Sequence, residues 1–287
     1  MQDFNGKVAI VTGAGSGLGQ VYAHNLSSLG AIVVVSDVSA EKAAVTVERI
    51  RETKGEAMAV PGGIATQSDA DNIVRMVLGA YGKIDILINA SGHNCSGPLM
   101  SLEPVEMTEI IQTQLMSCIY ATKAVLPEMV KNNKGHIVMT TSGIGIFGAE
   151  NNAVYAAATA GVAGFLKSVS LEVKNTEIKI NAVAPIANTQ NSDSFFEAVS
   201  GPDPEQYPME LVASAVAFLC HEKCSFSGRI LSLTAGRMAQ IFSSTVPGYF
   251  YAGHDMRDVV NNVDSILSTD HPLVPRDVSD ELFLIDI

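Results

Sequence analysis

The chain has few cysteines and few basic residues, and each shortage excludes a class of protein. Four cysteines in 287 residues are too sparse for a disulfide framework, so we expect a reducing, cytoplasmic location. Lysine and arginine number 18 against 30 acidic residues, which gives a formal net charge of -12. A surface that binds nucleic-acid phosphates is therefore not expected.

Long apolar runs are also missing. No uninterrupted stretch approaches the ~18 apolar residues that span a bilayer, and no signal-peptide pattern follows Met1. We therefore expect no membrane association. Apolar residues nevertheless make up 47% of the chain and charged residues 17%, which is the composition of a folded globular protein.

What the sequence does contain is a regular alternation of short apolar runs with helical patterns. Strands are predicted at residues 7–13, 31–37, 57–60, 84–89, 136–141, 179–183 and 229–233, and helices at 18–29, 40–53, 68–81, 107–131 and 152–173. Parallel neighbours need crossover connections, so this order predicts an α/β fold: a three-layer, doubly wound (Rossmann) parallel sheet in a single domain.

Two segments fall outside this alternation. Residues 188–208 are polar, contain Gly and Pro, and follow a strand end, which favours a lid or substrate loop. We assign residues 1–245 to the Rossmann-type domain and 246–287 to a C-terminal extension that either packs on a neighbouring subunit or is partly mobile.

A glycine-rich turn follows the first strand and opens the first helix. Gly13, Gly17 and Gly19 allow a tight turn and close approach of backbone N–H groups to a pyrophosphate, and Ser16 and Leu18 complete the predicted site. Asp37 ends the second strand, 24 residues after Gly13, where a carboxylate binds the 2′-hydroxyl of a ribose and repels a 2′-phosphate. The expected cofactor is NAD rather than NADP. Alternatively, Asp37 only caps the next turn.

Further motifs make residues 5–236 resemble the short-chain dehydrogenase/reductase family. The loop after the fourth strand matches the family's Asn-Asn/Ala-Ala/Ser-Gly pattern, and residues 181–189 match the segment that borders the nicotinamide in relatives. The resemblance adds to the cofactor site the residues Asn89, Ala90, Ser91, Gly92, Pro185 and Thr189.

The same resemblance assigns catalytic roles. Ser142 and Tyr155, thirteen residues apart, match the family's serine, which positions the carbonyl oxygen, and its tyrosine, which exchanges the alcohol proton. Read without the resemblance, they are a polar strand-end residue and a packing tyrosine. The family motif Tyr-x-x-x-Lys ends in Thr159 here, so no ammonium lowers the pKa of the phenol from this helix face. An unassisted phenol is ionised only to about one part in a thousand at neutral pH.

Other positions depart from the family pattern as well. Gln114 replaces the Asn of the proton relay, Gly63 stands near where an Asp often contacts adenine, and Ile186 replaces a Gly. Lys167, twelve residues after Tyr155, points about 120° away around the helix, so His93 in the loop after Gly92 is the better substitute base. Even so, a lone loop histidine is usually only surface.

Within the family, residues 218–224 and the extension look most similar to hydroxyacyl-CoA dehydrogenase units of multifunctional β-oxidation enzymes. Cys220, His221 and Cys224 lack a second ligand pair for zinc, so we expect buried thiols and no metal.

Two hypotheses follow. The first is an NAD-dependent dehydrogenase or reductase acting on a small-molecule substrate such as a hydroxyacyl thioester, its activity weakened by Thr159. The second is a non-catalytic subunit that pairs with an active paralogue. The resemblance implies a dimer or tetramer, with identical or paralogous partners, through the helices at 107–131 and 152–173.

Overall fold

The computed structural model describes residues 3–93, 96–189, 192, 196, 203–250 and 255–282. It divides into two compact units, Met1–Gln240 and Ile241–Ile287. The first unit contains the sheet and the predicted site residues, and each unit is described by itself below.

One eight-stranded sheet runs through the first unit in the order β3-β2-β1-β4-β5-β6-β7-β8. All the pairings from β3 to β7 are parallel. The strands are β1 (Val8–Thr12), β2 (Ile32–Asp37), β3 (Ala57–Pro61), β4 (Ile86–Asn89), β5 (Lys134–Thr140), β6 (Glu177–Ile186), β7 (Ile230–Thr234) and β8 (Arg237–Ile241). The chain adds strands outward from β1 to β3 and then places β4 on the other side of β1. The point where the strand order reverses therefore lies between β1 and β4. Ligands of such sheets bind at the carboxyl ends of the strands beside this point.

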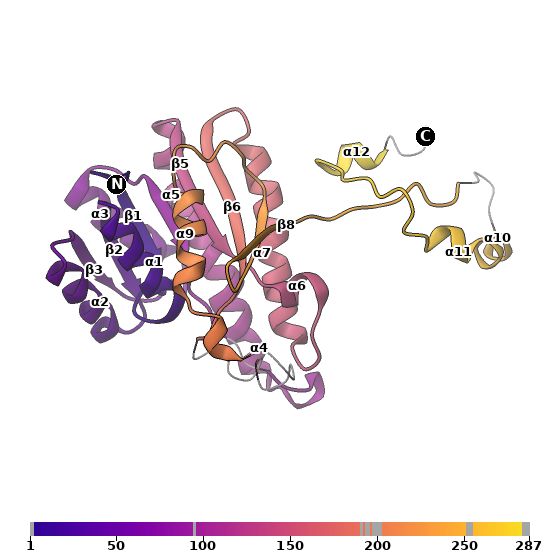
Figure 1. Cartoon of the computed structure of the whole chain (residues 1–287), viewed down its shortest axis with the longest axis horizontal. Coiled ribbons are helices and arrows are strands. Elements are labelled where there is room, and N and C mark those ends of the chain that lie inside the picture. Colours follow the sequence, from indigo (N-terminus) through magenta and orange to yellow (C-terminus); the bar gives the residue numbers. More distant parts are fainter. Residues whose placement is uncertain are drawn as a thin grey trace. The chain divides into compact units, whose positions relative to one another are not determined.

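Helices cover both faces of the sheet, which confirms the three-layer, doubly wound architecture (Figure 1). One layer contains α1 (Gly17–Ser28), α2 (Ala40–Glu52) and α9 (Glu210–Leu219). The other contains α3 (Gln67–Tyr81), α4 (Pro104–Ile111), α5 (Ser117–Lys131) and α7 (Ala153–Glu172). Strands β1 and β4 are buried over their whole length and β2 at all but its first residue, as their continuous apolar sequences predicted.

Three local features differ from the sequence-based expectation. The helix predicted at 107–131 begins at Pro104 and is interrupted by a π-helical segment, η2 (Gln112–Met116). A short helix, α6 (Gly143–Phe147), directly follows Ser142. Strand β8 follows β7 after a two-residue turn in which Ala235 and Gly236 both have positive φ, as in a tight hairpin. Its sequence, Arg-Met-Ala-Gln-Ile, is too polar to stand out as a strand.

Helix α7 has 20 residues with a mean hydropathy of 1.3, so by length and composition alone it would be able to cross a membrane. The sequence contains no uninterrupted apolar run here, but alanine and valine raise the mean between polar positions. A helix packed within a core passes the same test, and α7 packs against β5, β6 and α6.

The second unit contains three short helices, α10 (Met256–Asn261), α11 (Val263–Ile266) and α12 (Val278–Leu282). An isolated bridge pairs Thr245 with Leu273. Several of its described apolar side chains are exposed, among them Met256, Val260 and Leu267. The predicted packing of this extension on a neighbouring subunit stays a prediction.

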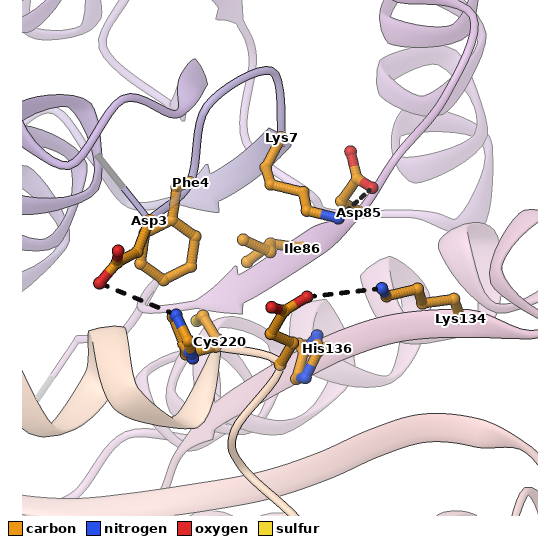
Figure 2. A pocket seen from close by; sticks show the side chains of 10 residues that line it. Asp3, Phe4, Lys7, Asp85, Ile86, Lys134, His136 and Cys220 are labelled. Atoms are coloured by element: carbon orange, nitrogen blue, oxygen red, sulfur yellow. Dashed lines mark ion pairs between the residues drawn. The ribbon is translucent and has the colours of Figure 1, made fainter. Parts of the chain in front are cut away.

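Charged residues gather at the amino end of the central strands, around a small hollow (Figure 2). Lys7 pairs with Asp85 at 3.6 Å and Lys134 with Glu222 at 3.9 Å. His136 on β5 lies among them with only 7% of its surface exposed. Burial, followed by the nearby positive charges, lowers the pKa of His136 to about 4, so its imidazole is neutral at physiological pH.

Candidate active site

The glycine-rich turn between β1 and α1 has the geometry of a phosphate cradle. Gly13 and Gly17 have φ of 63° and 56°, which side chains rarely adopt. A Cβ on Gly13 would lie 2.7 Å from the Cα of Ser91, and one on Gly19 would overlap the Gly13 carbonyl. Ser16 is the N-cap of α1, but its side chain makes no cap hydrogen bond to any described residue. The backbone N–H groups at the start of α1 thus remain available for an anion.

Asp37 ties this turn to the end of β2. Its Oδ2 accepts a hydrogen bond from the Gly15 N–H at 2.9 Å, and its Oδ1 accepts one from the Ser39 N–H at 2.9 Å. The second bond is the turn-capping role that the sequence left open for this residue. A carboxylate has about four acceptor positions, so both oxygens can also accept from ribose hydroxyls. A Cβ on Gly15 would touch Asp37 and the stem of Lys42, so no side chain fits between this carboxylate and the turn.

The loop after β4 is held against the glycine turn by a threonine. Thr12 Oγ1 accepts hydrogen bonds from the backbone N–H groups of Ala90 and Ser91, at 3.2 and 3.3 Å. Thr140 donates to the carbonyl of Asn89 at 2.8 Å, so the ends of β1, β4 and β5 are joined by side-chain hydroxyls. Neither threonine is predicted as a site residue from the sequence, although Thr12 directly precedes the first glycine of the turn.

Ser142 and Tyr155 come together as the spacing predicted. The Ser142 hydroxyl lies near enough to the Tyr155 phenol to lower its pKa. Ser142 also caps α6 by accepting the Ile144 N–H at 3.1 Å, which fixes its side chain at the end of β5. Burial raises the pKa of Tyr155 above its ordinary value of 10, and the Ser142 hydroxyl opposes this only in part. The phenol is therefore protonated at neutral pH.

Thr159 takes no part in this pair. Its Oγ1 donates to the carbonyl of Tyr155 at 2.9 Å, one turn back along α7, and the side chain is 1% exposed. Threonine in a helix commonly bonds in this way. Its own carbonyl accepts a hydrogen bond from Thr141 at 2.8 Å. The hydroxyl that replaces the family's ammonium thus stabilises the backbone of α7 and brings no charge to the phenol.

Gln114 sits in the π-helical segment and points toward the loop after β4. Its Nε2 donates to the carbonyl of His93 at 3.0 Å, and a Cβ on Gly92 would lie 2.5 Å from the same nitrogen. π-helical turns inside α-helices often occur at functional sites. Here the turn directs a buried amide at the loop that closes one side of the predicted nicotinamide site.

The remaining predicted positions are spread around this centre. Pro185 and Ile186 end β6, and the N–H of Thr189 donates to Ser192 Oγ at 2.7 Å. Leu18 packs against the core at the start of α1. Gly63 lies beside Val38, and much of the predicted substrate loop at 188–208 falls outside the described residues.

Neither proposed substitute for the lysine gains support from the geometry. His93 is exposed, and its carbonyl rather than its imidazole meets Gln114. Lys167 lies twelve residues along α7 from Tyr155, about 18 Å in the axial direction.

The two cysteines of the segment once considered for zinc are structural. Cys220 and Cys224 are buried, and burial raises the pKa of both thiols. The Nδ1 of His221 accepts a hydrogen bond from the Lys223 N–H at 3.0 Å, so that nitrogen is already engaged by the backbone.

Comparison with known proteins agrees with this geometry. The model of a family described as short chain dehydrogenase matches residues 7–198. The chain is 31% identical over 242 residues to peroxisomal multifunctional enzyme type 2 of Drosophila melanogaster, a match that covers 81% of the chain but only 40% of that protein. It is 30% identical over 252 residues to an uncharacterized oxidoreductase of Thermotoga maritima, covering 83% of the chain and 99% of the relative.

A solved structure shows the same fold. The crystal structure of a short chain dehydrogenase from Mycobacterium avium matches with a TM-score of 0.83 at 24% identity, and covers 95% of this chain and 98% of that one.

Proposed function

Because the chain belongs to the short-chain dehydrogenase/reductase family, we propose that it interconverts a secondary alcohol and a ketone with NAD(H), at a rate held low by the threonine in place of the lysine. The juxtaposition of Ser142 and Tyr155, at the end of β5 and the start of α7, carries this proposal.

The glycine turn and Asp37 fit the dinucleotide, whose nicotinamide supplies or accepts the hydride when bound. Ser142 hydrogen-bonds the substrate oxygen and fixes its position. Tyr155 donates its phenolic proton to that oxygen in ketone reduction and takes the alcohol proton in oxidation. Burial keeps the phenol protonated. Alcohol oxidation needs the phenolate, so oxidation is the direction that is slowed most by the missing ammonium.

Two measurements test this function. NADH at a hundredfold excess over its dissociation constant is expected to stabilise the protein by about 2.7 kcal/mol, measured as a thermal shift. A secondary alcohol with NAD should give slow NADH production that is lost in Tyr155→Phe, while the NADH-induced shift stays. Absence of any shift with NADH would remove the cofactor assignment itself.

The cofactor preference rests on Asp37, whose carboxylate repels a 2′-phosphate. In Asp37→Ser, the neighbouring Lys42 is left without this negative charge, and we expect the ratio of NADPH to NADH dissociation constants to fall about tenfold, equal to about 1.4 kcal/mol. Fluorescence titration of both nucleotides measures the ratio. Glu41→Ser, next to Lys42 on α2, is the control for a general loss of negative charge. An equal fall of the ratio in this control would refute the role of Asp37.

The resemblance of residues 218–224 and the extension to hydroxyacyl-CoA dehydrogenase units favours a hydroxyacyl chain as the substrate. The acyl part of such a molecule suits the exposed side chain of Phe147, at the end of the short helix that follows Ser142. We also propose assembly as a dimer or tetramer through α5 and α7, since the outer positions of α7 include the small residues Ala157, Ala160 and Gly164.

A second candidate function is that of a non-catalytic subunit paired with an active paralogue. The turned-away hydroxyl of Thr159 and the engagement of Gln114 with the His93 carbonyl favour it. NADH binding without turnover of any alcohol, together with co-purification of a paralogue, would support this function over the first.

A further inference from the structure

In the half of the first unit that runs from β4 to α9, the carboxyl edge of the sheet differs in charge from the amino edge. The sequence has no Lys or Arg between Lys83 and Lys123, between Lys134 and Lys167, or between Lys179 and Lys223. These three intervals hold eleven acidic residues, of which two, Asp85 and Glu222, lie at the amino edge of the sheet. They also contain every connection that leaves the carboxyl ends of β4, β5 and β6, where the Ser142–Tyr155 pair lies.

The lysines that bound these intervals lie away from the site. Lys83, Lys134 and Lys179 stand just before or at the start of their strands, at the amino edge of the sheet. Lys123 and Lys167 lie on helices that run from the site toward that same edge. They are about 13 Å beyond Gln114 and about 18 Å beyond Tyr155 along their helix axes.

The N-terminus of α4 offers no substitute for a cation on this side, whereas the start of α7, after Asn152, has no side-chain cap hydrogen bond among the described residues. The start of α4 is closed by a capping box in which the side chain of Glu103 accepts an N–H of the first turn and Glu106 accepts the Glu103 N–H at 2.9 Å. Two carboxylates thus occupy the position where a phosphate would bind. Arg237, at the start of β8, directs its guanidinium to Ser232 at 3.5 Å, on the outer strands of the sheet. Residues 241–287 bring two arginines and eight acidic residues.

Exposed apolar side chains lie in the connections that follow the carboxyl ends of β4 and β5. We call Leu99, Met100 and Phe147 the apolar rim; all three are exposed, Met100 at 99%. Phe147 ends α6, five residues after Ser142, and Leu99 and Met100 belong to the short helix η1 (Leu99–Ser101) in the connection after β4. The Gly97 N–H donates to the Asn151 carbonyl at 2.7 Å, which joins this connection to the turn four residues before Tyr155. In Figure 1, α4 and α6 lie toward the same end of the sheet.

From this arrangement we infer that the substrate is an uncharged, apolar ketone or secondary alcohol, not one carried on coenzyme A or another phosphate-bearing carrier. The inference rests on the proposed function, because it concerns the ligand of the same site. Coenzyme A carries a diphosphate and a 3′-phosphate, which proteins bind with Lys, Arg or free helix N-termini. The substrate side provides acidic and apolar groups instead, so it repels that nucleotide and retains the apolar part.

A matched pair of ligands tests the inference. The same 3-oxoacyl group is presented as its coenzyme A thioester and as its uncharged N-acetylcysteamine thioester, and binding of each is measured on the NADH complex of the Tyr155→Phe variant, in which turnover does not interfere. We expect the uncharged ester to bind at least about tenfold more tightly, with little dependence on salt. Preference for the coenzyme A ester, weakening as salt rises, would overturn the inference, and so would failure of the uncharged ester to bind.

A pair of variants places the effect at the rim. Met100→Lys is expected to weaken the uncharged ester several-fold and to narrow the gap between the two esters, whereas Met76→Lys on α3, an equally conservative surface change, leaves both unchanged. Equal effects of both variants would contradict a substrate site at the rim. The NADH-induced thermal shift distinguishes failure of the proposed function from failure of the substrate class. Loss of the shift refutes the proposed function. A retained shift together with tighter binding of the coenzyme A ester refutes only the substrate class.

Discussion

Thr159→Lys is expected to raise kcat/KM for alcohol oxidation by about 100-fold, within the range that general acid–base assistance contributes. In the natural chain the phenol of Tyr155 is buried, which raises its pKa, and the hydroxyl of Thr159 is bonded to the backbone. An ammonium from the same helix face would stabilise the phenolate.

The pH dependence of oxidation gives this prediction a second readout. The rate requires the deprotonated phenol, so in the natural chain it should keep rising with pH up to and beyond the ordinary phenol pKa of ~10. The lysine lowers the pKa of the phenol, so the rise should move to lower pH. Steady-state rates between pH 6 and pH 10, both within the working range of common buffers, measure the displacement of the curve.

Charge must be separated from bulk in this experiment. Thr159→Met has a long side chain without charge and should give no gain, and Tyr155→Phe in the lysine background should abolish the gain. A lysine variant with the natural rate and pH profile would show that the ammonium is not what the site lacks, and would favour the non-catalytic subunit.

The fold was predictable because its signals are local and repeated. Each buried strand is a short run of β-branched residues, as in residues 31–37, and the crossovers between them force parallel pairing. Ser142 and Tyr155, paired by the family resemblance, lie near one another because α7 begins two residues before Tyr155 and places its first turn beside the end of β5.

The features that the sequence did not reveal depend on which groups the side-chain hydroxyls and amides hydrogen-bond to. Nothing in the motif Tyr-x-x-x-Thr tells whether Thr159 faces the phenol or bonds back to α7, since both orientations are open to a helical threonine. The π-helical turn at Gln114 likewise has no local signature in the sequence, although in the structure η2 packs against α7. The separation of charge between the two sheet edges was present in the sequence but acquires meaning only once the strand directions are known.

The second large effect is expected in stability at low pH and comes from His136, far from the site. In the folded protein its pKa is about 4, below the ordinary value of 6.5, because its imidazole is buried and faces Lys134, Lys7, Lys179 and His221. The carboxylates of Asp3, Asp85 and Glu222 also line the hollow (Figure 2).

Between these two pKa values the unfolded chain binds a proton at this residue and the folded chain does not. Stability from this group is therefore fully present above about pH 6.5 and is lost as pH falls toward 4, by up to about 3 kcal/mol. Urea unfolding measured from pH 7 to pH 4 should show this slope, and His136→Asn, which cannot titrate, should flatten it. His93→Gln removes an exposed imidazole and should leave the slope as it is. If the His136 variant keeps the natural slope, the acid sensitivity comes from the carboxylates around the hollow and not from the imidazole. Protonation of Asp85 or Glu222 would break their ion pairs with Lys7 and Lys134, and the two ammonium groups would then repel one another.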